Sequence, residues 1–432
     1  MTMRLSKRSF KSFAGLAYNL PGLALLVVTL TGAYSIVYMG TYAVTSFTVV
    51  AIIALVAAVF NPNQIVAGFM KNPFGYLMIV LMMVSYIVGK QATATALALS
   101  CMYFLVYAAS FRAVDTSYMQ KWLQRWQIVM NVLAIYAFYQ LIGRSLGLPF
   151  TDLYFEGHMV EGYNWTNPVI VAGNSLMRSN AVFLEPSFFS QFLAINILIY
   201  AYRLLNEDAA GSRLRHVLCM LLNLGALITT FSGTGIVVLL IGAVAILFYM
   251  KDGIARAKIA VPAVLCGIAV LIGFLLFAPE SLISYFAERA SELLSYSDNA
   301  GSGYKRFNGS YQIALQAIEE TPLFGTGIGG VRGFVSSLGD ISFADSNNYV
   351  SNGFVRVAVE LGVPGLFLWC CFLGKAYFNK KKEYGFGSLI CLVSVLVISL
   401  NFCHEVFSGI YFWAFFCFLN TALYEDNKGD CA

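Results

Sequence analysis

Long apolar segments recur along almost the whole chain, and they limit its fold more than any other feature of the sequence. A helix needs about 20 predominantly apolar residues to cross the hydrocarbon core of a bilayer. Segments of this kind lie at residues 20–38, 42–60, 73–89, 92–111, 127–146, 182–203, 216–231, 235–250, 259–277, 354–374, 386–403 and 406–424. Only 11% of the residues are charged, whereas soluble domains carry about 25%. The sequence therefore predicts an all-α fold, a polytopic membrane bundle of about twelve transmembrane helices.

The basic residues are distributed unevenly between alternate loops, which predicts the orientation of the bundle. With a cytoplasmic N-terminus, the inner segments hold 19 of the 27 Lys and Arg residues, and the outer segments hold 8. Inner loops of membrane proteins are enriched in these residues, so both termini are expected in the cytoplasm. The chain then divides into N-terminal transmembrane helices (1–146), a first outer loop (147–181), central transmembrane helices (182–277), a large helical outer loop (278–353) and C-terminal transmembrane helices (354–432). Loops this long are commonly functional, so we expect a site on the outer face.

A set of ionisable residues lies close to the predicted outer membrane surface. The set comprises Arg178, Glu185, Arg306, Arg356, Glu360, His404 and Glu405. An ionisable side chain at membrane depth costs roughly 2.5–3.5 kcal/mol, so such residues usually have partners or a function. The arginine fork suits a phosphate or pyrophosphate group. The alternative is that these residues only pair with one another, as Arg356 and Glu360 can because they are four positions apart on one helix face. For the whole set, the pattern favours a polar site that faces outward.

Other sequence features are less specific. The string "GTGIGG" (residues 325–330) could present backbone N–H groups to a phosphate, but without a βαβ context a plain tight turn is the favoured interpretation. Aromatic and Asn residues in the first outer loop suit a sugar-binding surface, although an ordinary interfacial loop is favoured. The nine cysteines and three histidines have no metal-site spacing, and no basic face or RNA-reading motif occurs. We therefore expect no metal, no cofactor and no nucleic acid partner.

Three stretches resemble the Wzy-type polysaccharide polymerases and the related O-antigen ligases. "RSNAVFLEPSFFSQFL" (178–193) is similar to their Arg…Glu-Pro-Ser segment before a span, and "KRFNGSYQIALQAIEETPLFGTGIGG" (305–330) is similar to their Arg-led helix ending in Pro-Leu-Phe-Gly-x-Gly. "SNGFVRVAVELGVPGLFL" (351–368) is similar to their Glu-Leu-Gly-x-x-Gly helix. Each motif is loose, and their order and outer placement carry the resemblance. It implies a GT-C-like helical bundle with a large periplasmic loop.

The chain departs from the family pattern at two places. Many relatives carry His-Asn where this chain has Ser351-Asn352, and many carry Ser-Arg where it has Ser232-Gly233. The ligases depend on a histidine and an arginine at these places, so the resemblance favours a polymerase. Length and character favour an exopolysaccharide enzyme such as the xanthan type.

The resemblance implies a glycosyltransferase that joins oligosaccharide repeats carried on undecaprenyl pyrophosphate, at the periplasmic face of the bacterial inner membrane. It implies catalytic roles for Glu185, His404 and Arg306. Either Glu185 or His404 would orient the attacking hydroxyl as a base, and Arg306 would stabilise the leaving pyrophosphate. The residues expected to bind substrate are Arg178, Arg332, Asn352, Arg356 and Glu360.

The partners implied by the resemblance are the lipid-linked oligosaccharide, the bilayer, a chain-length co-polymerase and a flippase. Three alternatives to a polymerase stay open: an O-antigen ligase-like transferase, a polysaccharide flippase or transporter, and a scaffold of an assembly complex. A transporter would place its charges at the bilayer midplane and often shows inverted repeats. The outer clustering of charges and the long outer loops favour an enzyme instead.

Overall fold

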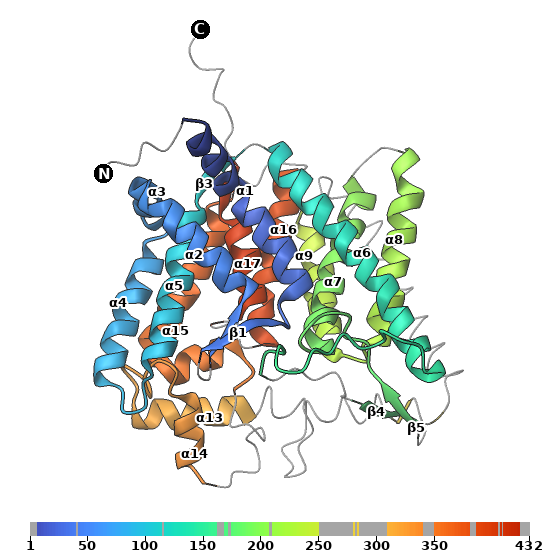
Figure 1. Cartoon of the computed structure of the whole chain (residues 1–432). Coiled ribbons are helices and arrows are strands. Elements are labelled where there is room, and N and C mark those ends of the chain that lie inside the picture. The colour runs from blue at the N-terminus through green and yellow to red at the C-terminus, as the bar shows by residue number, and fades with distance from the viewer. Residues whose placement is uncertain are drawn as a thin grey trace.

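The computed structural model describes residues 7–39, 42–114, 116–161, 168–171, 174–206, 210–249, 280, 283–284, 309–339, 350–380, 386–404, 407 and 409–423. Within these ranges the chain is mostly helical, and the long helices run side by side as a bundle (Figure 1). The helices are α1 (Lys7–Thr31), α2 (Ser46–Val59), α3 (Pro62–Lys71), α4 (Pro73–Val88), α5 (Ala94–Ser110), α6 (Thr116–Leu146), α7 (Pro186–Asn206), α8 (Ala210–Thr229), α9 (Gly233–Tyr249), α13 (Ser310–Glu320), α14 (Val331–Ser337), α15 (Gly353–Phe378), α16 (Phe386–Ser399) with the 3₁₀ turn η2 (Leu400–Phe402), and α17 (Ile410–Leu419).

Short strands accompany the helices. They are β1 (Ser35–Met39) antiparallel to β2 (Tyr42–Thr45), β3 (Arg112–Val114) parallel to β6 (Thr421–Leu423), and β4 (Pro168–Val171) antiparallel to β5 (Asn174–Met177). The all-α expectation is therefore right for the bundle, while these strands were not predicted. The sequences SIVYM and YAVT are apolar, so they extended the predicted spans 20–38 and 42–60. Their β-branched and aromatic residues favour strands, and hydropathy alone does not distinguish a short apolar strand from a helix.

Several described helices are candidates to cross a membrane. Three of them, α6, α7 and α15, are long and apolar enough, and α2 with α3 would add a fourth if that pair, bent by 107°, is one broken span. The C-terminal part of α1, together with α4, α5, α9, α16–η2 and α17, is apolar but shorter. Most of the predicted spans thus contain an apolar helix, and the span expected at 259–277 lies outside the described residues. The full count of about twelve spans and the GT-C-like arrangement stay predictions.

The two ends of the bundle differ. One end carries α13, α14 and the β4–β5 hairpin, and the opposite end carries α3, β3 and the start of α1 (Figure 1). We call the first of these the loop end. Segments predicted to be outer, such as the α6–α7 connection, lie at the loop end, and the α5–α6 connection, predicted to be inner, lies at the other. The helices therefore alternate in direction as the charge pattern requires, while the membrane side of each end stays a prediction.

The helix α7 is buried along most of its length and packs against α6, α8, α9 and α16. A network of buried amides joins it to two of these helices. Asn196 Nδ2 donates to Asn223 Oδ1 at 3.0 Å, Asn223 Nδ2 donates to Asn131 Oδ1 at 2.7 Å, and Gln127 Nε2 donates to Asn196 Oδ1 at 3.2 Å. Such side chains hydrogen-bond across helices in membrane proteins. The network fixes the register of α7, and so it also fixes the height of its first turn, which follows Glu185.

Candidate functional site

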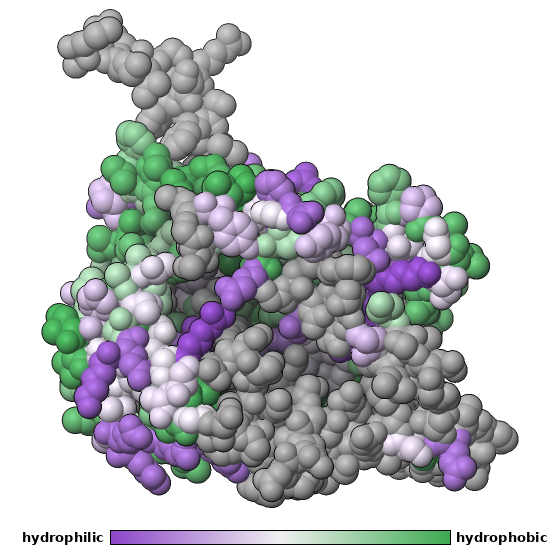
Figure 2. Space-filling model, turned by 60° about the horizontal axis from the view of Figure 1, so that its bottom comes forward, coloured by the Kyte–Doolittle hydropathy of each residue, from purple (hydrophilic) through white to green (hydrophobic). Residues whose placement is uncertain are grey.

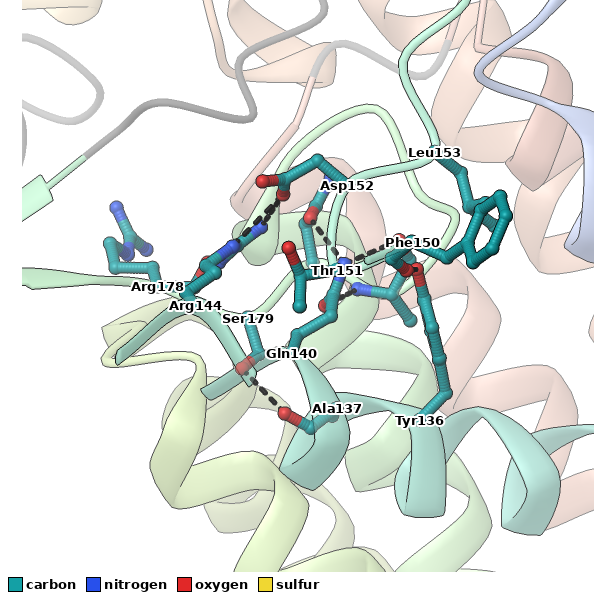
Figure 3. Close-up of polar contacts among 12 residues, drawn as sticks. Tyr136, Ala137, Gln140, Arg144, Phe150, Thr151, Asp152, Leu153, Arg178 and Ser179 are labelled. Carbon is teal, nitrogen blue, oxygen red and sulfur yellow. Dashed lines mark hydrogen bonds and ion pairs between the residues drawn. The ribbon is translucent and has the colours of Figure 1, made fainter. Parts of the chain in front are cut away.

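The segment 178–185 leads from the β4–β5 hairpin into α7 at the loop end, and Arg144 of α6 holds its first residue. Arg144 Nη1 donates to the backbone oxygen of Arg178 at 2.7 Å. The same guanidinium pairs with Asp152, with 2.9 Å between Nε and Oδ1 (Figure 3). Arg144 therefore has a structural role, because it holds the 178–185 segment in place. Asp152 of the first outer loop orients the Arg144 guanidinium.

A second residue of α6, Gln140, holds the middle of the segment. Its buried side chain accepts from Ala181 N at 2.8 Å and donates to Ala181 O at 3.1 Å. Ala181 has a φ of 49°, a conformation that is uncommon and costly for a residue with a Cβ. Strained backbone that the surroundings hold in place is common at functional sites. The bidentate contact with Gln140 makes this turn a candidate of that kind.

The side chain of Arg178 lies apart from the Arg144–Asp152 ion pair (Figure 3). Arg178 Nε donates to Thr230 O at 2.8 Å, just beyond the C-terminus of α8. Helix C-termini carry partial negative charge and attract cations. This contact fixes the plane of the Arg178 guanidinium, and the residue is only partly buried. An oriented, accessible fork of this kind suits an anionic group.

Glu185 and His404 both lie next to the first turn of α7. Glu185 directly precedes Pro186, the first residue of α7, and Ser187 Oγ donates to Glu185 Oε2 at 2.7 Å. Phe188, in the first turn of α7, stacks on the imidazole of His404 with 3.9 Å between ring centroids and 15° between ring planes. Glu185 is partly exposed, whereas His404 is 5% exposed. The two predicted bases therefore belong to one local assembly, in which Glu185 is the more accessible.

Hydroxyl groups near the starts of α7 and α9 form a hydrogen-bonded chain beside the first turn of α7. Thr234 Oγ1 donates to Ser187 O at 3.1 Å and lies 3.1 Å from Ser190 Oγ and 2.9 Å from Ser232 Oγ. Ser190 Oγ also donates to Ser187 O at 2.7 Å. These contacts tie the start of α9 to the first turn of α7. These contacts were not predicted, although the string "FSGTG" (231–235) contains the hydroxyl groups of Ser232 and Thr234.

Asn352, predicted to bind substrate, caps α15. Its Oδ1 accepts from the backbone N–H groups of Phe354 at 3.0 Å and Val355 at 3.1 Å, as Asn commonly does at a helix start. Its Nδ2 donates to Phe402 O at 3.2 Å. These contacts give Asn352 a structural role, because they join α15 to the segment that leads to His404. Its role in substrate binding stays a prediction.

Arg356 and Glu360 pair with each other, as their spacing predicted. Arg356 Nε donates to Glu360 Oε1 at 2.9 Å, and the two side chains are 16% and 2% exposed. Arg332, on α14, is far more exposed and lies 3.5 Å from Glu161 of the first outer loop. Arg306 and Glu405 lie outside the described residues.

The helix α15 is kinked just after this pair. Gly362 has a φ of 69° and a ψ of −170°, and Pro364 follows it. Proline has no N–H, so the helical donor to Glu360 O is missing. Gly327 N and Ser85 Oγ replace it, at 3.1 Å and 3.0 Å. The kink therefore provides an acceptor for the glycine turn and for α4.

The glycine turn (residues 325–330) is packed against this kink. Thr326 N donates to Val359 O at 2.8 Å, while Val363 N donates to Pro322 O at 3.0 Å instead of continuing the helix. A Cβ on Gly325 would lie 2.4 Å from the backbone carbon of Glu360. The interpretation as a plain tight turn is confirmed, since its amides at 325, 326, 327 and 330 donate to backbone oxygens of the protein.

The contact between the glycine turn and the kink can be tested with alanine at two glycines. Gly325 and Gly339 have φ values of 64° and 79°, but a Cβ on Gly339 would meet nothing within 4 Å. Gly339→Ala should therefore cost about 1–2 kcal/mol of unfolding free energy, from backbone strain alone. Gly325→Ala should cost distinctly more, because it also separates the turn from α15. Thermal unfolding in detergent measures both variants, and equal shifts would contradict this account of the contact.

A cavity of about 300 Å³ opens between α5, the glycine turn and α15. We call it the α5–α15 cavity. Its walls include Thr93, Ser100, Arg332, Arg356, Glu360 and Phe407. Figure 2, viewed from the loop end, shows hydrophilic side chains spread over this face and a hollow near its centre. Among the described residues, no group of three His, Cys, Asp or Glu side chains could hold a metal ion.

The central part of the chain is similar to a known family. Residues 218–370 match the model of the O-antigen ligase family. This match supports the resemblance to the Wzy-type polymerases and O-antigen ligases. No curated protein matches the chain.

The matched region begins in α8 and ends in α15, so it covers roughly a third of the chain. It contains Arg332, Asn352, Arg356 and Glu360. The Arg178–Glu185 segment and His404 lie outside it, so their assignment depends on the sequence motif and on their packing. The match supports a transferase of ligase or polymerase type, acting on a lipid-linked glycan in a membrane. With the apolar helices, it indicates a multi-pass membrane protein.

Proposed function

We propose that this protein polymerises oligosaccharide repeats carried on undecaprenyl pyrophosphate, at the periplasmic face of the bacterial inner membrane, into exopolysaccharide or O-antigen. The bond between the anomeric carbon of the growing glycan and its pyrophosphate oxygen breaks, and undecaprenyl pyrophosphate leaves with the electron pair. A sugar hydroxyl of the next lipid-linked repeat forms the new glycosidic bond and gives its proton to a base. Both chain termini lie in the cytoplasm, and the reacting groups lie at the loop end.

This proposal rests on the oriented side chains of Arg178 and Glu185, at the two ends of the 178–185 segment, and on the contact of His404 with the turn that follows. An oriented guanidinium lies at one end of the 178–185 segment, and a carboxylate lies at the other. The carboxylate is next to a turn that stacks on an imidazole. Charge stabilisation and proton acceptance are the two tasks that the transfer requires of the protein. Arg306, which begins the second family motif, is proposed as a further cation for the leaving pyrophosphate.

The second candidate function is an O-antigen ligase, which the description of the matching family favours. A ligase transfers the finished glycan to a different acceptor, so the two functions share a donor and differ in the hydroxyl that attacks. Ser351 stands where the ligases rely on histidine, which supports the polymerase. A flippase would move the lipid-linked repeat without breaking any glycosidic bond.

The deciding experiment supplies the purified protein with a single defined lipid-linked repeat, without nucleotide sugar or added metal. A polymerase converts it into a ladder of lipid-linked oligomers and releases undecaprenyl pyrophosphate in equal amount to the bonds formed. Transfer that occurs only when lipid A core is added would identify a ligase. Unchanged repeats that cross a vesicle membrane would identify a flippase and exclude the polymerase.

A further inference from the structure

The α5–α15 cavity extends from the loop end into the bundle. Thr93 and Ser100 both line it, and α5 rises by about 10 Å between these positions. Thr93 is exposed, whereas Ser100 is buried, so the cavity runs from an open mouth to a closed floor. Its volume of about 300 Å³ corresponds to about ten water molecules. That space suits one sugar ring with its hydroxyl groups, and it is too small for a polyprenyl chain.

The charges around the cavity favour a neutral, hydroxyl-rich ligand over a pyrophosphate. Arg356 is paired with Glu360 at 2.9 Å, so the inner wall carries a balanced ion pair. Arg332 adds a cation on the lining, but its side chain is 62% exposed and lies 3.5 Å from Glu161. Carboxylate and guanidinium groups side by side offer both acceptors and donors, as sugar hydroxyl groups require. Thr93, Thr95 and Ser100 add further hydroxyl groups.

The cavity and the proposed reaction site are also lined or contacted by residues that are close in the sequence. Phe407 lines the cavity, and His404, three residues before it, stacks on Phe188 next to Glu185. Two residues three positions apart therefore contact the cavity (Phe407) and the first turn of α7 (His404). If one sugar ring of an oligosaccharide is held in the cavity, the sugar units next to it can extend toward the first turn of α7, which follows Glu185.

We infer that the α5–α15 cavity is the subsite that binds a sugar ring of the acceptor oligosaccharide. This inference rests on the proposed function. The pyrophosphate is assigned to the arginines, and the cavity is assigned to the neutral sugar that supplies or adjoins the attacking hydroxyl. The cavity then contributes to the choice of acceptor, because only a ring that fits it places its hydroxyl next to the base.

The test fills the cavity without touching the proposed reacting residues. Thr95 and Ala98 are both exposed residues of α5, but only Thr95 lines the cavity. Thr95→Trp adds bulk inside it, and Ala98→Trp adds bulk of the same kind on another face of the same helix. The probe is the repeat oligosaccharide released from its lipid and coupled to a fluorescent aglycone, offered at increasing concentration with a fixed amount of lipid-linked donor.

We expect Thr95→Trp to raise the KM for the soluble acceptor by about tenfold or more, with the KM for the lipid-linked donor unchanged. Ala98→Trp should leave both values as in the wild type. An unchanged acceptor KM in Thr95→Trp would overturn the inference. A raised donor KM would overturn it as well, because the cavity would then hold the donor glycan.

A binding measurement separates this inference from the proposed function. Saturation-transfer NMR on the solubilised protein detects the released oligosaccharide without any turnover. Loss of the signal in Thr95→Trp but not in Ala98→Trp supports the cavity as a sugar site, even if no polymer forms. An equal signal in both variants and the wild type would overturn the inference, even if the wild-type protein polymerises normally.

Discussion

Replacing Glu185 by Gln is expected to lower the rate of glycan transfer by about 100- to 10,000-fold, the usual contribution of a general base. The substitution keeps the shape of the side chain and removes its ability to accept a proton. Ser187 Oγ donates to Glu185 Oε2 at 2.7 Å, so the carboxylate is oriented, and it is partly exposed to an incoming hydroxyl. The rate is measured as bonds formed per minute with a purified lipid-linked repeat.

Two further variants provide a control for the charge change and test which residue is the base. Glu319→Gln changes an exposed carboxylate of α13 and should leave the rate unchanged. His404→Gln should have a smaller effect than Glu185→Gln, because His404 is only 5% exposed and its ring stacks on Phe188. The reverse order, with His404 essential and Glu185 dispensable, would assign the base to His404.

Replacing Arg178 by Ala is expected to lower kcat by about 100- to 1,000-fold, the usual loss when one oriented donor to developing charge is removed. The leaving pyrophosphate gains charge as its bond to the sugar breaks, and the guanidinium is already oriented by Thr230 O at 2.8 Å. No reorganisation is then needed during the reaction. The measurement is release of undecaprenyl pyrophosphate under saturating donor.

The loss of the α8 contact must be separated from the loss of catalysis. Removing the cation near the C-terminus of α8 should cost about 0.3–1 kcal/mol of stability, which thermal unfolding in detergent measures. Lys90→Ala removes an exposed cation from the α4–α5 connection, also at the loop end, and should keep full activity. Wild-type turnover in Arg178→Ala would contradict the role proposed for this arginine, and equal losses in both variants would indicate a general electrostatic effect.

The sequence predicted those features that depend on composition and on neighbours along the chain. Hydropathy predicted most of the apolar helices. The distribution of Lys and Arg predicted that successive helices alternate in direction between the two ends of the bundle. The spacing of Arg356 and Glu360 predicted their ion pair, because residues four apart on a helix share a face. The order of three motifs predicted a resemblance to the Wzy-type polymerases and O-antigen ligases, which the family match at residues 218–370 supports.

Short-range patterns were insufficient where the same residues suit two local structures. The apolar stretches near residues 35–45 were assigned to spans, and they form the β1–β2 hairpin. Asn352 was assigned to substrate from its place in a motif, while its side chain caps α15 and holds Phe402. Capping and binding both use amide groups, so sequence alone does not separate them.

The tertiary structure alone decided which distant residues meet at the candidate site. Phe188 and His404 are more than 200 positions apart, and nothing in the sequence around either residue indicates that they stack. Gln140 reaches Ala181, and Thr234 reaches the turn of Ser187, only because α6 and α9 pack beside α7. The glycine turn, which contributes Gly329 to the α5–α15 cavity, likewise reaches α15 because the kink at Gly362 leaves backbone oxygens for it. Local spacing determines what shares a helix face, whereas the packing of helices determines which faces meet, and the site lies between those faces.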